Sequence, residues 1–137
     1  MSPTAAALLG FAAWTIFLVL ALGALRSATA MTTGKKASTF SPGGEDLPGL
    51  GRRLTRAHAN CYENLPVAAA LLLYAVATDA THVTDPLAYW FLGARLAQSL
   101  THIVSASDVA VLVRFGFYIV QILIQIYWLL AFTGVAQ

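Results

Sequence analysis

Two long stretches of the chain contain no charged residue, residues 5–25 and residues 115–137. A helix needs about 20 apolar residues to cross the hydrocarbon layer of a bilayer. Only 10% of the residues are charged, so the chain lacks the polar surface of a soluble domain. A typical soluble domain has roughly 25%. We therefore expect an integral membrane protein.

Two further apolar segments carry polar residues. Residues 65–78 are too short to span a bilayer unless their helix starts earlier and includes Asn60 and Glu63, and residues 86–107 contain Arg95. We expect four transmembrane helices, at about 4–26, 57–78, 86–105 and 109–133. The sequence thus predicts one domain over residues 1–137, an all-α membrane bundle of four helices. A cleaved secretory signal is the alternative for the first span, although no positive charge precedes it.

Basic residues are concentrated in one connection. Six of the eight Lys and Arg residues lie in or beside residues 27–55, whereas residues 79–85 hold two acids and no basic residue. By the positive-inside rule, we expect the 27–55 loop in the cytoplasm and both termini outside, in an inner or plasma membrane. The net charge of +2 is too small to indicate a nucleic-acid partner.

Polar residues within three spans follow helical spacing. Intervals of three, four and seven residues place each set on one face of its helix. Polar groups are costly inside a membrane and usually face protein or water. The sets are Arg56, Asn60 and Glu63; Arg95, Gln98, Ser99 and His102; and Arg114, Tyr118, Gln121 and Gln125.

The expected topology brings these sets together near the cytoplasmic end. Three arginines there face a single acid, Glu63, so the cluster carries an excess of positive charge. Such a site favours a compact anion whose carboxylates arginine binds in a bidentate manner. The alternative is that these residues only join helices by hydrogen bonds or by an Arg95–Glu63 ion pair. The unequal charges favour a ligand site.

Residues 56–66, RAHANCYENLP, resemble the second-helix signature of the MAPEG family, the membrane-associated proteins in eicosanoid and glutathione metabolism. The family pattern is Arg-Ala-His/Gln-x-Asn-x-x-Glu, usually followed closely by Pro, and every position is kept. Arg95, Arg114 and Tyr118 also resemble family positions. In length and four-span layout the resemblance covers the whole chain, and it indicates a bacterial-type member.

The resemblance implies a homotrimer with glutathione, as co-substrate, bound between neighbouring subunits near the cytoplasmic side. In catalytic members an arginine at the start of the fourth helix stabilises the glutathione thiolate, and Arg114 matches it. The implied glutathione-binding residues are Arg26, Arg56, Asn60, Glu63, Arg95, His102 and Tyr118.

Some positions depart from the family pattern. Ala59 stands where the prostaglandin-synthase branch has another arginine. Gln98 and His102 stand where glutathione-using members often have His or Tyr followed by Tyr. The gap between Arg95 and Arg114 is also longer than in the mammalian enzymes. The branch of the family therefore stays open.

We expect a microsomal-type glutathione transferase or peroxidase that acts on lipophilic small molecules arriving from membrane lipids. A non-catalytic lipid-binding or scaffold member is the main alternative, and a small transporter subunit is another. Cys61 lies in an apolar helix without a polarising partner in the sequence, which favours packing over catalysis. Asp79, His82 and Asp85 are too few to predict a metal site.

Overall fold

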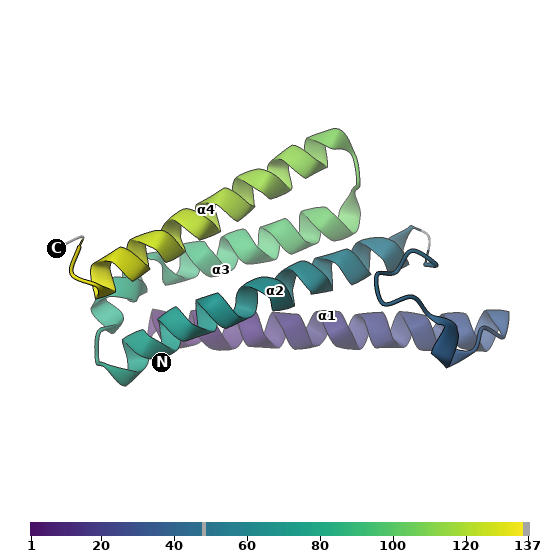
Figure 1. Ribbon diagram of the computed structural model, residues 1–137, viewed down its shortest axis with the longest axis horizontal. Coiled ribbons are helices and arrows are strands. Elements are labelled where there is room, and N and C mark those ends of the chain that lie inside the picture. Colours follow the sequence, from purple (N-terminus) through teal and green to yellow (C-terminus); the bar gives the residue numbers. More distant parts are fainter. Residues whose placement is uncertain (48, 136–137) are drawn as a thin grey trace.

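The computed structural model describes residues 1–47 and 49–135, which form four α-helices and one short 3₁₀ helix. Consecutive α-helices run in opposite directions (Figure 1), so the start of α1 and the end of α4 lie at the same end of the bundle as the α2–α3 turn. The α1–α2 and α3–α4 connections lie at the opposite end, which we call the loop end. This arrangement confirms the predicted all-α, four-helix architecture. The elements are α1 (Pro3–Thr33), η1 (Ala37–Thr39), α2 (Leu50–Ala77), α3 (Thr81–Val104) and α4 (Asp108–Phe132).

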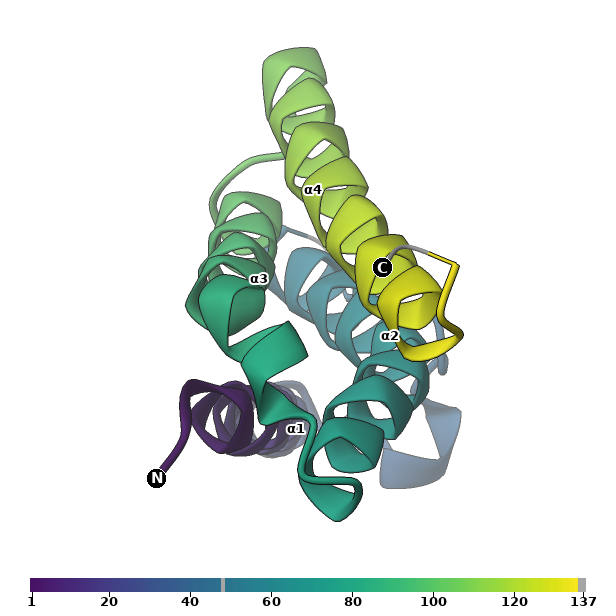
Figure 2. The same cartoon turned by 90° about the vertical axis from the view of Figure 1, so that its left-hand side faces the viewer.

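Three helices form the centre of the bundle. Helices α1, α2 and α3 pack pairwise against one another, whereas α4 packs along α3 and makes few contacts with α2 (Figure 2). The ring of Phe91 lies 5.9 Å from that of Phe11 and 5.4 Å from that of Trp128, measured between centroids, which joins α1, α3 and α4. Buried Ala57, Ala68 and other alanines let the helix backbones approach closely, as is common between membrane helices.

Polar side chains satisfy the helix ends. The hydroxyl groups of Ser2 and Ser107 accept hydrogen bonds from main-chain N–H groups in the first turns of α1 and α4. Helix α1 is capped at its C-terminal end by Gly34, whose φ of 71° is the left-handed conformation that favours glycine. Asp85 at the start of α3 accepts a 2.9 Å hydrogen bond from the main-chain N–H of Thr4, which holds the first turns of α1 and α3 together.

Helices α1 and α2 extend beyond the predicted spans, so the connection predicted over 27–55 is corrected to 34–49. Charge limits a membrane span but does not end a helix, because arginine is a good helix former. Arg52 and Arg53 therefore lie within α2. Beyond the first predicted span, the hydroxyl groups of Thr29, Thr32 and Thr33 bond to carbonyl groups one turn back, so these polar residues remain helical.

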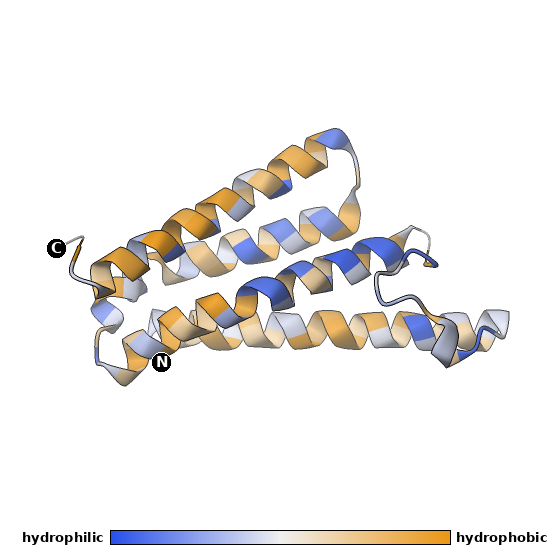
Figure 3. Cartoon of the chain, in the orientation of Figure 1, coloured by the Kyte–Doolittle hydropathy of each residue, from blue (hydrophilic) through white to orange (hydrophobic). Residues whose placement is uncertain are grey.

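Hydropathy changes from one end of the bundle to the other. Hydrophilic residues gather towards the loop end, especially in the first half of α2, and apolar residues cover much of the remainder (Figure 3). Large apolar side chains such as Leu20, Trp90 and Leu112 are exposed on the outside. Within the described residues, α1 and α4 are long and apolar enough to cross a membrane by length and composition. Helices α2 and α3 are also long enough but carry the polar sets.

Candidate functional site

A groove runs between α2 and α4, which barely touch. Four hollows of about 450, 340, 260 and 470 Å³ follow one another along it from the loop end. Each shares lining residues with the next: His102 and Arg114 line the first and second, Tyr118 the second and third, and Val67 the third and fourth. We call this continuous feature the α2–α4 groove.

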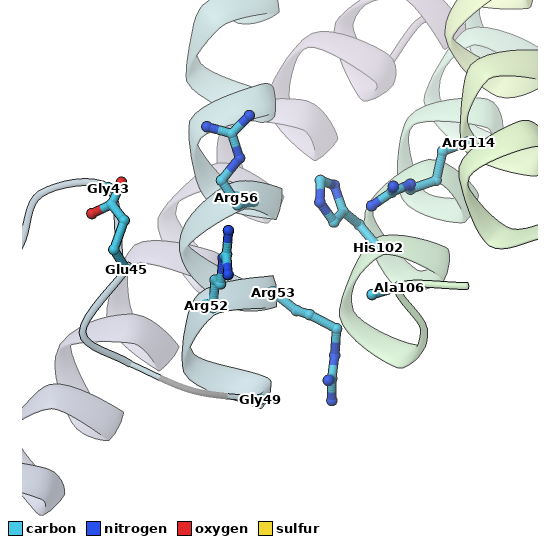
Figure 4. A pocket seen from close by; sticks show the side chains of 9 residues that line it. All are labelled: Gly43, Glu45, Gly49, Arg52, Arg53, Arg56, His102, Ala106 and Arg114. Carbon is cyan, nitrogen blue, oxygen red and sulfur yellow. The ribbon is translucent and has the colours of Figure 1, made fainter. Parts of the chain in front are cut away.

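The first hollow, at the loop end, is strongly basic, and we call it the mouth. Figure 4 shows that α2 supplies three of its arginines, and that His102 and Arg114 reach towards each other from α3 and α4. The residues lining the mouth are Gly43, Glu45, Gly49, Arg52, Arg53, Arg56, His102, Ala106 and Arg114.

Glu45 is the only acid in the lining of the mouth. A hydrogen bond from the Ser41 hydroxyl group holds the pKa of the Glu45 carboxyl below its usual value, and the nearby positive charge of Arg52 acts in the same direction. Glu45 is therefore ionised at neutral pH. One carboxylate among four arginines leaves the mouth with an excess of positive charge.

The second hollow is mixed in character, and we call it the middle of the groove. Asn60 and Glu63 of α2 lie there with His102 of α3 and with Arg114 and Tyr118 of α4. Among the described residues, the only salt bridge joins Lys35 to Asp46, so the exposed Glu63 carboxylate has no cationic partner. The Arg95–Glu63 ion pair of the structural alternative is therefore not formed.

Arg95 lies beneath the groove rather than in its lining. Its side chain is fully buried, with the guanidinium 5.1 Å from the centre of the Phe11 ring. Arg95 Nη1 donates a 2.7 Å hydrogen bond to Asn60 Oδ1, whereas Nε and Nη2 have no partner. A buried guanidinium without a carboxylate is costly. Because Arg95 contacts Asn60, which lines the groove, it is a candidate for a functional role.

The far end of the groove is apolar. Its 470 Å³ hollow is lined by side chains such as Val67 and Leu71 of α2 and Ile122 and Leu129 of α4. The 260 Å³ hollow before it still carries amides, with Gln125 Nε2 donating a 2.8 Å hydrogen bond to Asn64 Oδ1. The groove therefore changes from basic to polar to apolar along its length.

Arg26 is the predicted site residue that lies apart from the others. Its guanidinium donates a 3.2 Å hydrogen bond to the main-chain oxygen of Ser41 and lies 6.0 Å from the centre of the Phe40 ring. It faces the 34–49 connection and lines none of the four hollows. Arg56, Asn60, Glu63, His102, Arg114 and Tyr118 all line the groove.

Two arginines of the mouth were absent from the predicted site. Arg52 and Arg53 precede Arg56 by four and three residues, so they continue its face of the helix by another turn. The predicted helix began at residue 57, so both arginines fell in the predicted loop. Gln98 was also left out, although it belongs to the polar set of the third span and lines the middle of the groove.

Cys61 and the group of Asp79, His82 and Asp85 lie outside the lining of this site. Cys61 is buried beside Ser99, with 3.2 Å between Sγ and Oγ, and lines none of the four groove hollows. Within residues 1–47 and 49–135, no group of three or more His, Cys, Asp or Glu side chains is arranged to hold a metal ion.

The fold and groove describe an all-α protein of the membrane type, with a basic hollow at one end of a groove and an apolar hollow at the other. The family model of the MAPEG family matches residues 4–133, so the chain belongs to this family of integral membrane proteins linked to eicosanoid and glutathione metabolism. The predicted family membership is confirmed. No curated protein and no solved structure matches the chain significantly.

Proposed function

We propose that the protein is a glutathione-dependent membrane enzyme of the microsomal transferase type, which conjugates or reduces lipophilic electrophiles. The observation that carries this proposal is the gradient along the α2–α4 groove. Arg114 stands between a basic mouth and a polar middle, and an apolar hollow lies farther along the same groove. A charged co-substrate and a lipophilic substrate can therefore meet within one groove.

Glutathione has the charges that this site would bind. It carries two carboxylates and one ammonium group, and so has a net negative charge at neutral pH. Arginine binds carboxylates in a bidentate manner, which suits the cluster around Arg56. Glu63 is the unpaired acid of the middle of the groove and would bind the ammonium group.

Arg114 would stabilise the reactive form of glutathione. The thiolate is the nucleophile, and a nearby guanidinium lowers the pKa of a thiol without losing its own proton. The sulfur lone pair forms a C–S bond while the displaced group leaves with the electrons of its bond. With a hydroperoxide, the thiolate sulfur attacks the terminal oxygen and the O–O bond breaks, so that the alkoxide takes a proton from water and leaves as an alcohol. The glutathione sulfenic acid that remains then condenses with a second glutathione to give the disulfide and water.

We further propose that the protein is a homotrimer in an inner or plasma membrane, with the 34–49 connection in the cytoplasm. Arg26 supports a site shared between subunits, because it does not line the groove of its own chain. A neighbouring copy would bring its own Arg26 to a glutathione carboxylate. We also propose that the protein is a bacterial-type member of the family.

Turnover by the purified protein tests the proposal. We expect glutathione-dependent conversion of a model electrophile or a lipid hydroperoxide, strongly reduced by Arg114→Ala and by Glu63→Gln. Lys36→Ala is the matched control, because Lys36 is exposed in the connection and lines none of the groove hollows. Absence of turnover with both substrates, although glutathione binds, would reject the catalytic proposal.

A second candidate is a non-catalytic lipid-binding member of the family. The observation in its favour is Gln98, whose amide lies near Arg114 and accepts a hydrogen bond from Gln121 but cannot transfer a proton as His or Tyr can. This candidate predicts glutathione or lipid binding without turnover. Glutathione-independent flux of solutes across the membrane of liposomes that contain the protein would instead indicate a transporter subunit.

A further inference from the structure

Two amide side chains in the middle of the groove are oriented by buried partners. Asn60 and Gln98 both line the 340 Å³ hollow. An amide can present either its donor nitrogen or its acceptor oxygen to a ligand. Which atom faces the groove therefore decides which ligand groups the site accepts.

Arg95 determines the orientation of Asn60. A guanidinium has hydrogen-bond donors and no acceptor, so the atom of Asn60 that contacts it is the oxygen. The 2.7 Å hydrogen bond from Arg95 Nη1 to Asn60 Oδ1 has this arrangement. A second, longer contact of 3.5 Å joins the same nitrogen to the main-chain oxygen of Asn60. Burial of Arg95 leaves this guanidinium few other positions.

Gln121 determines the orientation of Gln98 by the same logic. Gln121 Nε2 donates a 2.9 Å hydrogen bond to the main-chain oxygen of Phe117, which can only accept. Its second N–H group therefore faces Gln98 and donates a 2.8 Å hydrogen bond to Gln98 Oε1. Gln121 is fully buried, so the pair lies between α3 and α4 away from water.

The nitrogen atoms of both groove amides remain available. Some buried side-chain atoms lack a hydrogen-bond partner, among them Arg95 Nε, Arg95 Nη2 and Gln121 Oε1. The amide nitrogens of Asn60 and Gln98 are not among these buried atoms, so they are not closed off from the groove. Neither nitrogen donates to another described residue. Both are therefore free to donate to a molecule in the groove.

We propose that Arg95 and Gln121 are positioning residues that turn two groove amides into hydrogen-bond donors. The inference rests on the proposed glutathione function and specifies which part of glutathione these amides bind. They select its acceptor groups, the carboxylate or peptide carbonyl oxygens. Glu63 supplies the acidic acceptor beside them. Arg95 thus acts through Asn60, without touching the ligand.

Three substitutions of Arg95 separate orientation from charge. Arg95→Lys keeps both the charge and a side chain that can only donate, Arg95→Gln removes the charge and can either donate or accept, and Arg95→Met keeps neither. We would measure binding of S-methylglutathione, which has no thiol, to the full-length protein in nanodiscs. Arg95→Lys should bind within about threefold of the wild type, and Arg95→Met should bind about tenfold to a hundredfold more weakly, as expected for one hydrogen bond to a charged group. Arg95→Gln should fall between them, because its amide can meet Asn60 with either atom.

Gln121→Met provides an independent test should Arg95→Met fail to fold. It removes the partner of Gln98 with no change in charge, and it also removes the unpartnered Gln121 Oε1. Its affinity for S-methylglutathione should fall several-fold at unchanged thermal stability. Wild-type affinity in the folded Arg95→Met or Gln121→Met protein would overturn the corresponding assignment, and so would failure of the wild type to bind the analogue.

The two proposals fail in different ways. Glutathione turnover by the wild type, combined with unchanged analogue binding in Arg95→Met, would overturn the positioning role and leave the enzymatic proposal standing. The expected order of affinities, combined with no turnover, would support the positioning role and reject catalysis.

Discussion

Arg53 Nε donates a 2.6 Å hydrogen bond to the main-chain oxygen of Ile103. This contact ties the first turns of α2 to the last turn of α3, where helix carbonyls lack partners within the helix. A cation near the C-terminal end of a helix is also favourable. The same contact keeps His102, the neighbour of Ile103, beside the arginines of the mouth.

Replacing Arg53 should therefore destabilise the fold. We expect Arg53→Ala to lower the free energy of unfolding by about 1 kcal/mol, the value of a typical hydrogen bond. Thermal unfolding in detergent would measure it. Arg52→Ala is the matched control, because Arg52 is exposed and makes no hydrogen bond to a described residue. Equal losses in the two variants would contradict the role of the Ile103 contact.

Asn60→Asp should raise thermal stability. A carboxylate in place of the amide oxygen would give the buried guanidinium of Arg95 the counter-ion that it lacks, while keeping the shape of the side chain. We expect the melting temperature to rise by about 2–5 °C. Asn64→Asp is the control, because Asn64 accepts from the neutral Gln125 and should gain nothing. A lower melting temperature in Asn60→Asp than in Asn64→Asp would refute this account of Arg95.

The 34–49 connection should loosen in acid. The Lys35 ammonium group, 2.6 Å from Asp46, and the main-chain N–H of Ser41 hold the pKa of the Asp46 carboxyl below its usual value. A lowered pKa in the folded state means that this stabilisation is complete above the unfolded pKa and is lost as pH falls through the folded pKa. Limited proteolysis by an acid-active protease should therefore cut the connection faster as the pH falls below about 4.

Asp46→Asn supplies the control for this pH dependence. It removes the titrating group, so cleavage of the connection should be faster than in the wild type near neutral pH and should change less as the pH falls. Identical pH profiles for the two proteins would show that the Lys35–Asp46 pair does not hold the connection.

The sequence predicted the four helices and most of the groove because both follow from helical periodicity. Apolar runs identify α1 and α4, and the intervals from Arg56 to Glu63 and from Arg114 to Tyr118 place these residues on single faces. The predicted start of the second helix, at residue 57, was wrong because a run of arginines ends a membrane span without ending a helix. Arg52 and Arg53 were lost from the site for that reason.

Contacts between helices could not be predicted from the sequence, because they depend on the register of one helix against another. Gln98 and Gln121 both stood on polar faces, but nothing in their spacing indicated that they pair with each other. Arg95 was expected among the glutathione-binding residues, and the sequence did not indicate that its guanidinium lies beneath Asn60. Arg26 ends the first predicted span, yet the longer α1 and the 34–49 connection place it against Phe40.

The central claim is that Arg114 stabilises a glutathione thiolate, and its most direct test is ultraviolet absorbance on adding glutathione to the purified protein. The wild type should show the thiolate band at neutral pH, Arg114→Lys should retain part of it, and Arg114→Ala should show none while still binding S-methylglutathione. A thiolate band of wild-type size in Arg114→Ala would contradict the account.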